Sequence, residues 1–126
     1  MREKIAAASS REGLVIVADG TKSVEALGKG SLPVEVEPFG WEATLDALAS
    51  LGCEAQLRLA QSHPFVTDGG HCTIDCQFPG ITEPAALDTV IKHIPGALES
   101  GLFTGLARAA VIAHDETENG TEVIEL

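Results

Sequence analysis

The sequence predicts an α/β fold in which a βαββαβ module is inserted into a second, parallel sheet. Two observations lead to this prediction. Between residues 33 and 105, segments of alternating polarity, typical of half-buried strands, are interleaved with two segments of helical periodicity. Outside that region, Leu14–Ala18 and Ala109–Ala113 are short, continuous apolar runs, which are typical of strands buried on both faces of a parallel sheet.

The first 32 residues predict a helix, a strand and a turn. A helix is expected over residues 2–11, with Ile5 and the alanines as its apolar stripe and a glycine beyond its end. The strand Leu14–Ala18 follows and stops at the turn Asp19-Gly20. Further glycines and a proline then break the pattern before residue 34, which marks a boundary.

The inserted module has six predicted elements. In chain order they are a strand at 34–37, a helix at 41–51, strands at 56–59 and 71–78, a helix at 83–94 and a strand at 97–103. Thr82 is the expected cap of the second helix, with Pro84 in its first turn. This order is that of ferredoxin-like modules, in which an antiparallel sheet carries two helices on one face.

Two more strands are expected after the module, at Ala109–Ala113 and Thr121–Leu126, with a polar turn at Asp115–Gly120 between them. Because the two continuous apolar runs are alike in kind, we expect both ends of the chain to share one sheet. The predicted division is therefore residues 1–32 with 106–126 as one part, and residues 33–105 as the ferredoxin-like α+β subdomain.

Composition narrows the class of protein. A net charge of −11 argues against nucleic acid as a general partner, because phosphate binding needs a basic surface. The longest apolar run is far too short to cross a bilayer, and no apolar segment typical of a secretory signal follows the first residues. A cytoplasmic protein without a membrane partner is expected. Its three cysteines, an odd number, are expected to be reduced thiols.

Basic residues are concentrated at the start of the chain. Residues 1–29 hold five of the eight basic side chains against four acidic ones, whereas the remainder holds three basic and fifteen acidic. If the protein handles an anion, this first segment is the place to look. An ordinary solvated helix followed by a loop explains the same pattern without any function.

A zinc site can also be drawn, from His63, His71, Cys72 and Cys76. Their spacing matches no closed zinc motif, and the sequence has no C-x-x-C pair. Cys72 and Cys76 are four residues apart on a predicted strand, so they are expected to share one of its faces. We therefore expect no metal.

Several short motifs resemble those of A-type ribose-5-phosphate isomerases, in that family's order and at about its spacing. They are Arg2-Glu3-Lys4-Ile5, Ala18-Asp19-Gly20-Thr21-Lys22, Leu27-Gly28, Leu32-Pro33-Val34-Glu35-Val36-Glu37-Pro38, Val66-Thr67-Asp68-Gly69-Gly70, Ile94-Pro95-Gly96 and Gly101-Leu102-Phe103. The likeness covers essentially the whole chain.

The resemblance implies a fold and a reaction. The fold is part of a Rossmann-like parallel sheet with the ferredoxin-like subdomain inserted. The reaction is the interconversion of ribose 5-phosphate and ribulose 5-phosphate in the non-oxidative pentose phosphate pathway, through an enediolate and without metal or redox cofactor. Glu3 aligns with the family's general base, and Lys22 with a substrate-binding lysine at the phosphate end. A homo-oligomer, dimer or tetramer, is also implied.

The sequence departs from the family upstream of Glu3. The family's Gly-Ser-Thr-type phosphate loop, its Asp-Gly-Ala-Asp-Glu-type motif and its Lys-Gly-Gly-Gly-type turn precede the glutamate, and none of them occurs here. We therefore expect the isolated chain to be an incomplete isomerase. The alternative is a non-catalytic ferredoxin-like module that dimerises or binds a small ligand.

Overall fold

Alternating polarity places the apolar side chains of four strands on one face of an antiparallel sheet. The strands are β2 (Leu32–Val36), β3 (Glu54–Leu57), β6 (Cys72–Gln77) and β7 (Ala97–Ser100), arranged in the order β3-β6-β2-β7. Numbered within the module, this is the ferredoxin-like arrangement, with the first and third strands side by side in the centre. The predicted α+β subdomain is confirmed.

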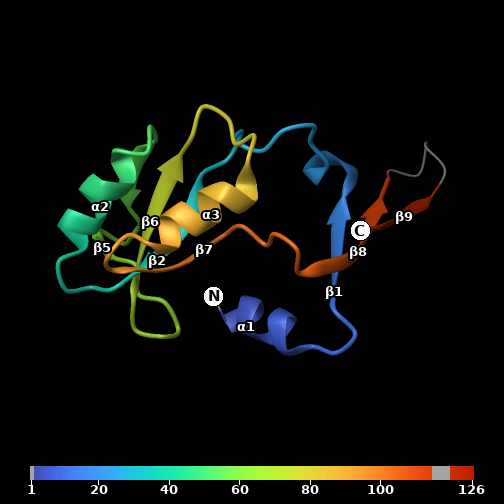
Figure 1. Ribbon diagram of the computed structural model, residues 1–126, viewed down its shortest axis with the longest axis horizontal. Helices are drawn as coiled ribbons and strands as arrows, with labels where there is room; N and C mark the ends of the chain where they lie inside the picture. The colour runs from blue at the N-terminus through green and yellow to red at the C-terminus, as the bar shows by residue number, and fades with distance from the viewer. Residues whose placement is uncertain (1, 115–119) are drawn as a thin grey trace. The chain divides into compact units, whose positions relative to one another are not determined.

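Two helices, α2 (Trp41–Ala49) and α3 (Pro84–Lys92), cover that apolar face (Figure 1). Val34, Val36 and Ile74 from the sheet and Leu48 and Ile91 from the helices are completely buried. Burial of each such side chain contributes roughly 1.5–3 kcal/mol, so this layer is the main source of the module's stability.

The two ends of the chain form a second sheet, with the order β1-β8-β9. Strand β1 (Leu14–Asp19) runs parallel to β8 (Ala107–Ala113), which pairs antiparallel with β9 (Thr121–Glu125). The prediction that the chain ends share a sheet is confirmed. The expectation that β1 is buried on both faces is wrong for this chain, since Val15 and Val17 are 52% and 75% exposed.

The helix α1 (Arg2–Ser9) precedes β1, and only part of its predicted apolar stripe, Ile5 and the alanines, is buried. Ile5 is 69% exposed, whereas Lys4 and Ala7 are buried. The Lys4 ammonium lies 5.6 Å from the centre of the Phe103 ring. A cation over an aromatic face is favourable, so Lys4 joins Ala7 on the buried face of the helix, and the prediction is wrong for Ile5.

The cap of α3 also differs from the prediction. Glu83, not Thr82, occupies the N-cap position and makes no capping hydrogen bond with its side chain, while Pro84 begins the helix as expected. A proline at the first helical position has no N–H group to satisfy, which reduces the need for a cap.

A short hairpin between β3 and β6 was not predicted. It consists of β4 (Leu59–Ala60) and β5 (His63–Pro64), joined by Gln61 and Ser62. Both loop residues have positive φ, 50° and 69°, as a two-residue turn of the primed type requires. Asparagine and glycine usually mark such turns, so this sequence gave no signal for one.

The structure is a computed structural model that describes residues 2–114 and 120–126. It divides into two compact units, residues 26–102 and residues 2–25 with 103–126. The division after residues 32 and 105 stays a prediction, and most of the predicted turn Asp115–Gly120 lies outside the described residues. Among the described helices, none has both the length and the apolar character that a membrane span requires.

Candidate active site at the carboxyl edge of the parallel strands

The loop that follows β1 is ordered by Asp19. This residue caps a short 3-10 helix, η1 (Gly20–Lys22), and its carboxylate accepts hydrogen bonds from the backbone N–H of Thr21, at 2.9 Å, and from the Thr21 hydroxyl. Lys22 is the last residue of η1, and it is exposed.

The charge of Asp19 is stabilised within this loop. The hydrogen bond from the Thr21 hydroxyl lowers the pKa of Asp19 most, and the positive charge of Lys22 lowers it further. Asp19 is therefore ionised at neutral pH, and its oxygens are engaged by its own loop. Its contribution is to hold Lys22 in a defined backbone conformation.

His114 lies beside the same loop, and the sequence analysis missed it. A methyl group built on Gly20 would come within 3.0 Å of His114 Nδ1, while Nε2 of that ring lies 3.4 Å from Glu122 Oε2. His114 directly follows β8, as Asp19 ends β1, and the two strands are parallel with Asp19 opposite Ala113. Carboxyl ends of parallel strands meet at one edge, where ligands bind in open α/β sheets, so the sequence did contain a signal for His114.

Glu3 is in the first turn of α1 and is exposed. An acidic side chain there is favoured by the helix dipole. The neighbouring Lys4, buried against Phe103, fixes the rotation of the helix and therefore the direction of Glu3.

The structure brings some of the predicted site residues into one unit. Glu3 and Lys22 both belong to the unit that contains β1, and Lys22 shares its loop with Asp19. Along the chain, α1 leads into the amino end of β1, whereas Lys22 follows its carboxyl end (Figure 1). The pairing of Glu3 and Lys22 around one substrate stays a prediction.

The side chains drawn as a zinc site do not converge. Cys72 and Cys76 both point into the core of the ferredoxin-like module, which confirms that they share a face. His63 is in the exposed hairpin, and His71 Nδ1 lies 2.9 Å from Glu35 Oε1. Within residues 2–114 and 120–126, no cluster of three or more His, Cys, Asp or Glu side chains is arranged to hold a metal ion.

Two of the sequence motifs form a polar network in the module. Thr67 Oγ1 donates a hydrogen bond of 2.7 Å to the Glu35 carboxylate and accepts one of 3.1 Å from the backbone N–H of His71. Burial raises the pKa of Glu35, but hydrogen bonds, those from Thr67 and His71 among them, outweigh it and hold that pKa below its usual range. These motif residues therefore have a structural role in closing the loop before β6.

Comparison with known proteins settles the family. The family model described as ribose 5-phosphate isomerase A (phosphoriboisomerase A) matches residues 1–117. The chain belongs to this family. Ribose-5-phosphate isomerase A of Gloeobacter violaceus is 53% identical over 125 residues, covering 98% of this chain and 53% of that protein. The Bacillus mycoides protein of the same name is 46% identical over 121 residues, covering 95% and 53%.

Solved structures of the ribose-5-phosphate isomerase A family have the same fold. The enzyme from Methanocaldococcus jannaschii aligns with a TM-score of 0.89 at 31% identity, over 99% of this chain and 54% of that one. A D-ribose-5-phosphate isomerase in complex with phospho-erythronic acid aligns with a TM-score of 0.90 at 30% identity, over 98% and 54%. The chain thus spans about half the length of the relatives it matches.

Proposed function

We propose that this chain supplies the base and the phosphate-end lysine of a ribose-5-phosphate isomerase, an aldose–ketose isomerase that needs no metal or redox cofactor. The single observation that carries the proposal is the match of nearly the whole chain to the family. The motif that contains Glu3 and the loop that contains Lys22 both lie within the matched residues. The match favours the isomerase over a non-catalytic ferredoxin-like module.

In the proposed reaction, the Glu3 carboxylate takes the proton from C2 of the open-chain aldose. The C2–H electron pair forms a C1–C2 double bond, and the carbonyl electron pair moves onto the C1 oxygen, which gives an enediolate. The proton of the C2 hydroxyl passes to the C1 oxygen, the C2 carbonyl forms, and the electron pair of the C1–C2 double bond takes the proton back from Glu3 at C1. A positioned carboxylate is suited to this transfer between adjacent carbons because it acts first as base and then as acid.

Lys22 is proposed to bind the phosphate. Its ammonium is a compact positive charge at the carboxyl edge of parallel strands, where anions and other ligands bind in open sheets. Asp19 keeps the loop in one conformation, and Gly20 leaves space beside His114. A solved relative in complex with phospho-erythronic acid, a phosphorylated acid, is consistent with an anion site of this kind.

The remaining parts of the proposal follow from the family and from composition. The substrate is a sugar phosphate, the compartment is the cytoplasm, and the protein acts as a homo-oligomer without nucleic acid or membrane partners. Because the chain spans about half of its relatives, activity is proposed for this chain joined to the family's other half rather than for the chain alone.

The test uses the chain alone and a longer chain, in which it is joined to the remaining half of the Gloeobacter violaceus relative. Conversion of ribose 5-phosphate is measured for Glu3→Gln and for the matched control Glu12→Gln, an exposed glutamate just beyond α1. We expect the longer chain to be active and Glu3→Gln to lower kcat roughly 10²–10⁴-fold, with Glu12→Gln unchanged. An active Glu3→Gln chain would refute the assignment of the base.

Lys22→Met is compared with Lys29→Met, another exposed lysine, in the same longer chain. Loss of a charge-assisted contact to the phosphate should raise KM by about tenfold to a hundredfold. Equal KM values for the two variants would refute the proposal that Lys22 binds the substrate phosphate.

A further inference from the structure

His114 directly follows β8 and is held in place from the side of β9. Its backbone N–H donates a hydrogen bond of 3.1 Å to the Gly120 carbonyl, and its ring nitrogen Nε2 lies 3.4 Å from Glu122 Oε2. Strand β8 is the central strand of its sheet, with β1 on one side and β9 on the other. The backbone of His114 is therefore fixed by the sheet, and its ring has a defined position beside β9.

On its other side, the imidazole ring packs against Gly20. Asp19 lies opposite Ala113 in the parallel pair of β1 and β8, so the next residues, Gly20 and His114, leave the sheet side by side. A methyl group built on Gly20 would lie 3.0 Å from Nδ1 and 3.5 Å from Cε1 of the ring. The ring of His114 thus lies against the place where any other residue at position 20 would carry its Cβ atom.

The backbone at Gly20 does not itself require a glycine. Gly20 is the first residue of η1, and its φ lies outside the left-handed region, so other residues can adopt the same conformation. In a helical turn, glycine is less stable than alanine because it loses more conformational freedom on folding. The close approach of the His114 ring therefore accounts for a glycine at this position.

The loop that carries Lys22 depends on the position of Gly20. The Asp19 carboxylate accepts hydrogen bonds from the backbone N–H and the hydroxyl of Thr21, and the Ser23 N–H donates one of 3.3 Å to the Gly20 carbonyl. Lys22 lies between these two contacts along the chain. A shift of Gly20 would disturb both of them, and the backbone of Lys22 would move with them.

We propose that His114 is a positioning residue for Lys22. Its ring, held from the side of β9, keeps Gly20 and the following loop in the conformation in which Lys22 binds the substrate phosphate. The binding role of Lys22 rests on the proposed function of this chain. The base of that proposal, Glu3, belongs to α1 and not to this loop, so His114 acts on substrate binding and leaves the proton transfer unchanged.

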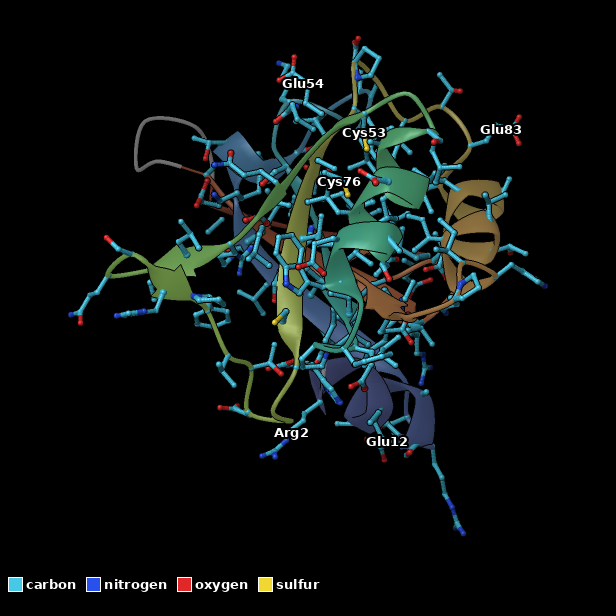
Figure 2. The ribbon with its side chains drawn as sticks, turned by 90° about the vertical axis from the view of Figure 1, so that its left-hand side faces the viewer. Arg2, Glu12, Cys53, Glu54, Cys76 and Glu83 are labelled. Carbon is cyan, nitrogen blue, oxygen red and sulfur yellow. The ribbon has the colours of Figure 1, made fainter. Side chains whose placement is uncertain are left out.

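Amide hydrogen exchange, followed by NMR in the chain alone, tests whether His114 holds the loop. His114→Ala should make the hydrogen-bonded amides of Thr21 and Ser23 exchange about twofold to tenfold faster. The internal reference is α1, which Figure 2 shows between the labelled residues Arg2 and Glu12 and which leads into the other end of β1. Unchanged exchange in the loop, or an equal increase in α1, would overturn the proposal.

A reciprocal substitution tests the contact between the two residues. Gly20→Ala places a methyl group against the ring and should also speed exchange of the same two loop amides, once rates are corrected for the intrinsic rate of each sequence. In the double variant Gly20→Ala/His114→Ala, the methyl group has room, so exchange should be slower than in Gly20→Ala. Exchange in the double variant that is at least as fast as in Gly20→Ala would refute the contact.

Kinetics of the longer chain, joined to the other half of the family, test the consequence for binding. His114→Ala should raise KM about twofold to tenfold with kcat unchanged, while the control His93→Ala, at an exposed position after α3, should change neither.

In a Lys22→Met background, His114→Ala should raise KM no further, because the group that it positions is gone. The same rise in KM in that background, or a fall in kcat with KM unchanged, would refute the positioning role. If Lys22→Met itself leaves KM unchanged, the proposed function of Lys22 is wrong, whereas the exchange rates still decide whether His114 holds the loop.

Discussion

His71 Nδ1 lies 2.9 Å from Glu35 Oε1, so the imidazole ring just before β6 is in hydrogen-bonding contact with a carboxylate of β2. Glu35 is 8% exposed, and Thr67 donates to the same oxygen. The contacts connect the loop before β6 to the central strand. A buried carboxylate of this kind depends on its hydrogen bonds for its ionised state.

We predict that Glu35 makes the free energy of unfolding of the chain decrease at acidic pH. Because its pKa is lowered in the folded state, its contribution is present above the usual carboxyl value of 4.5 and is lost as pH falls through the folded pKa. Glu35→Gln should lower the free energy of unfolding at pH 7 by about 1–3 kcal/mol. Below pH 4.5, the free energy of unfolding of this variant should decrease less steeply with falling pH than that of the unmodified chain. Urea unfolding at a series of pH values measures the free energy of unfolding and its dependence on pH, with Glu37→Gln, at an exposed position, as control. The same pH dependence below 4.5 for the two variants would refute the prediction.

Gly96 should not tolerate a side chain. Its φ is +87°, and a methyl group on it would lie 2.4 Å from Thr44 Oγ1, which hydrogen-bonds to the Pro95 carbonyl. Gly52 has a similar φ of +94° with nothing within 4 Å, so Gly52→Ala reports the backbone strain alone. In urea unfolding, we expect Gly96→Ala to lower the free energy of unfolding by about 1–3 kcal/mol more than Gly52→Ala does. An equal loss in the free energy of unfolding for the two variants would mean that the Thr44 side chain moves aside without penalty and would contradict the prediction.

Phe103 should hold α1 in place through Lys4. Phe103→Leu removes the aromatic face that lies beside the buried Lys4 ammonium, and with it one favourable contact between α1 and the rest of its unit. We expect faster amide hydrogen exchange in α1, by about twofold to thirtyfold if about 0.5–2 kcal/mol is lost. Phe39→Leu, at a 91% exposed position, is the matched control. Unchanged exchange in α1 would show that other contacts fix the helix.

The isolated chain should also associate through β1. This strand is at the edge of the three-stranded sheet, and Val15 and Val17 expose apolar surface on it. Exposed edges and apolar faces pair with other chains. Val17→Asp should therefore reduce the average mass in sedimentation at tens of micromolar, whereas Val24→Asp in the following loop should not. A clean monomer for the unmodified chain would contradict this prediction.

The sequence by itself determined the βαββαβ order of the ferredoxin-like module, although not the hairpin of β4 and β5. Period-two alternation in β2 and helical spacing in α2 and α3 are local properties of the chain, set by which side chains face a core. The motifs around Glu3 and Lys22 likewise identified the family, because their residues stand close together in the sequence.

Only the tertiary structure decided the features that depend on distant partners. The burial of Lys4 involves Phe103, and the position of His114 depends on the pairing of β8 with β1. The exposure of Val17 depends on what packs against the face of the sheet on which it lies. The turn at Gln61 and Ser62 also follows from the pairing around it, since neither residue favours a positive φ. Local periodicity reports which face of an element is apolar, but what covers that face is set by residues far away in the sequence.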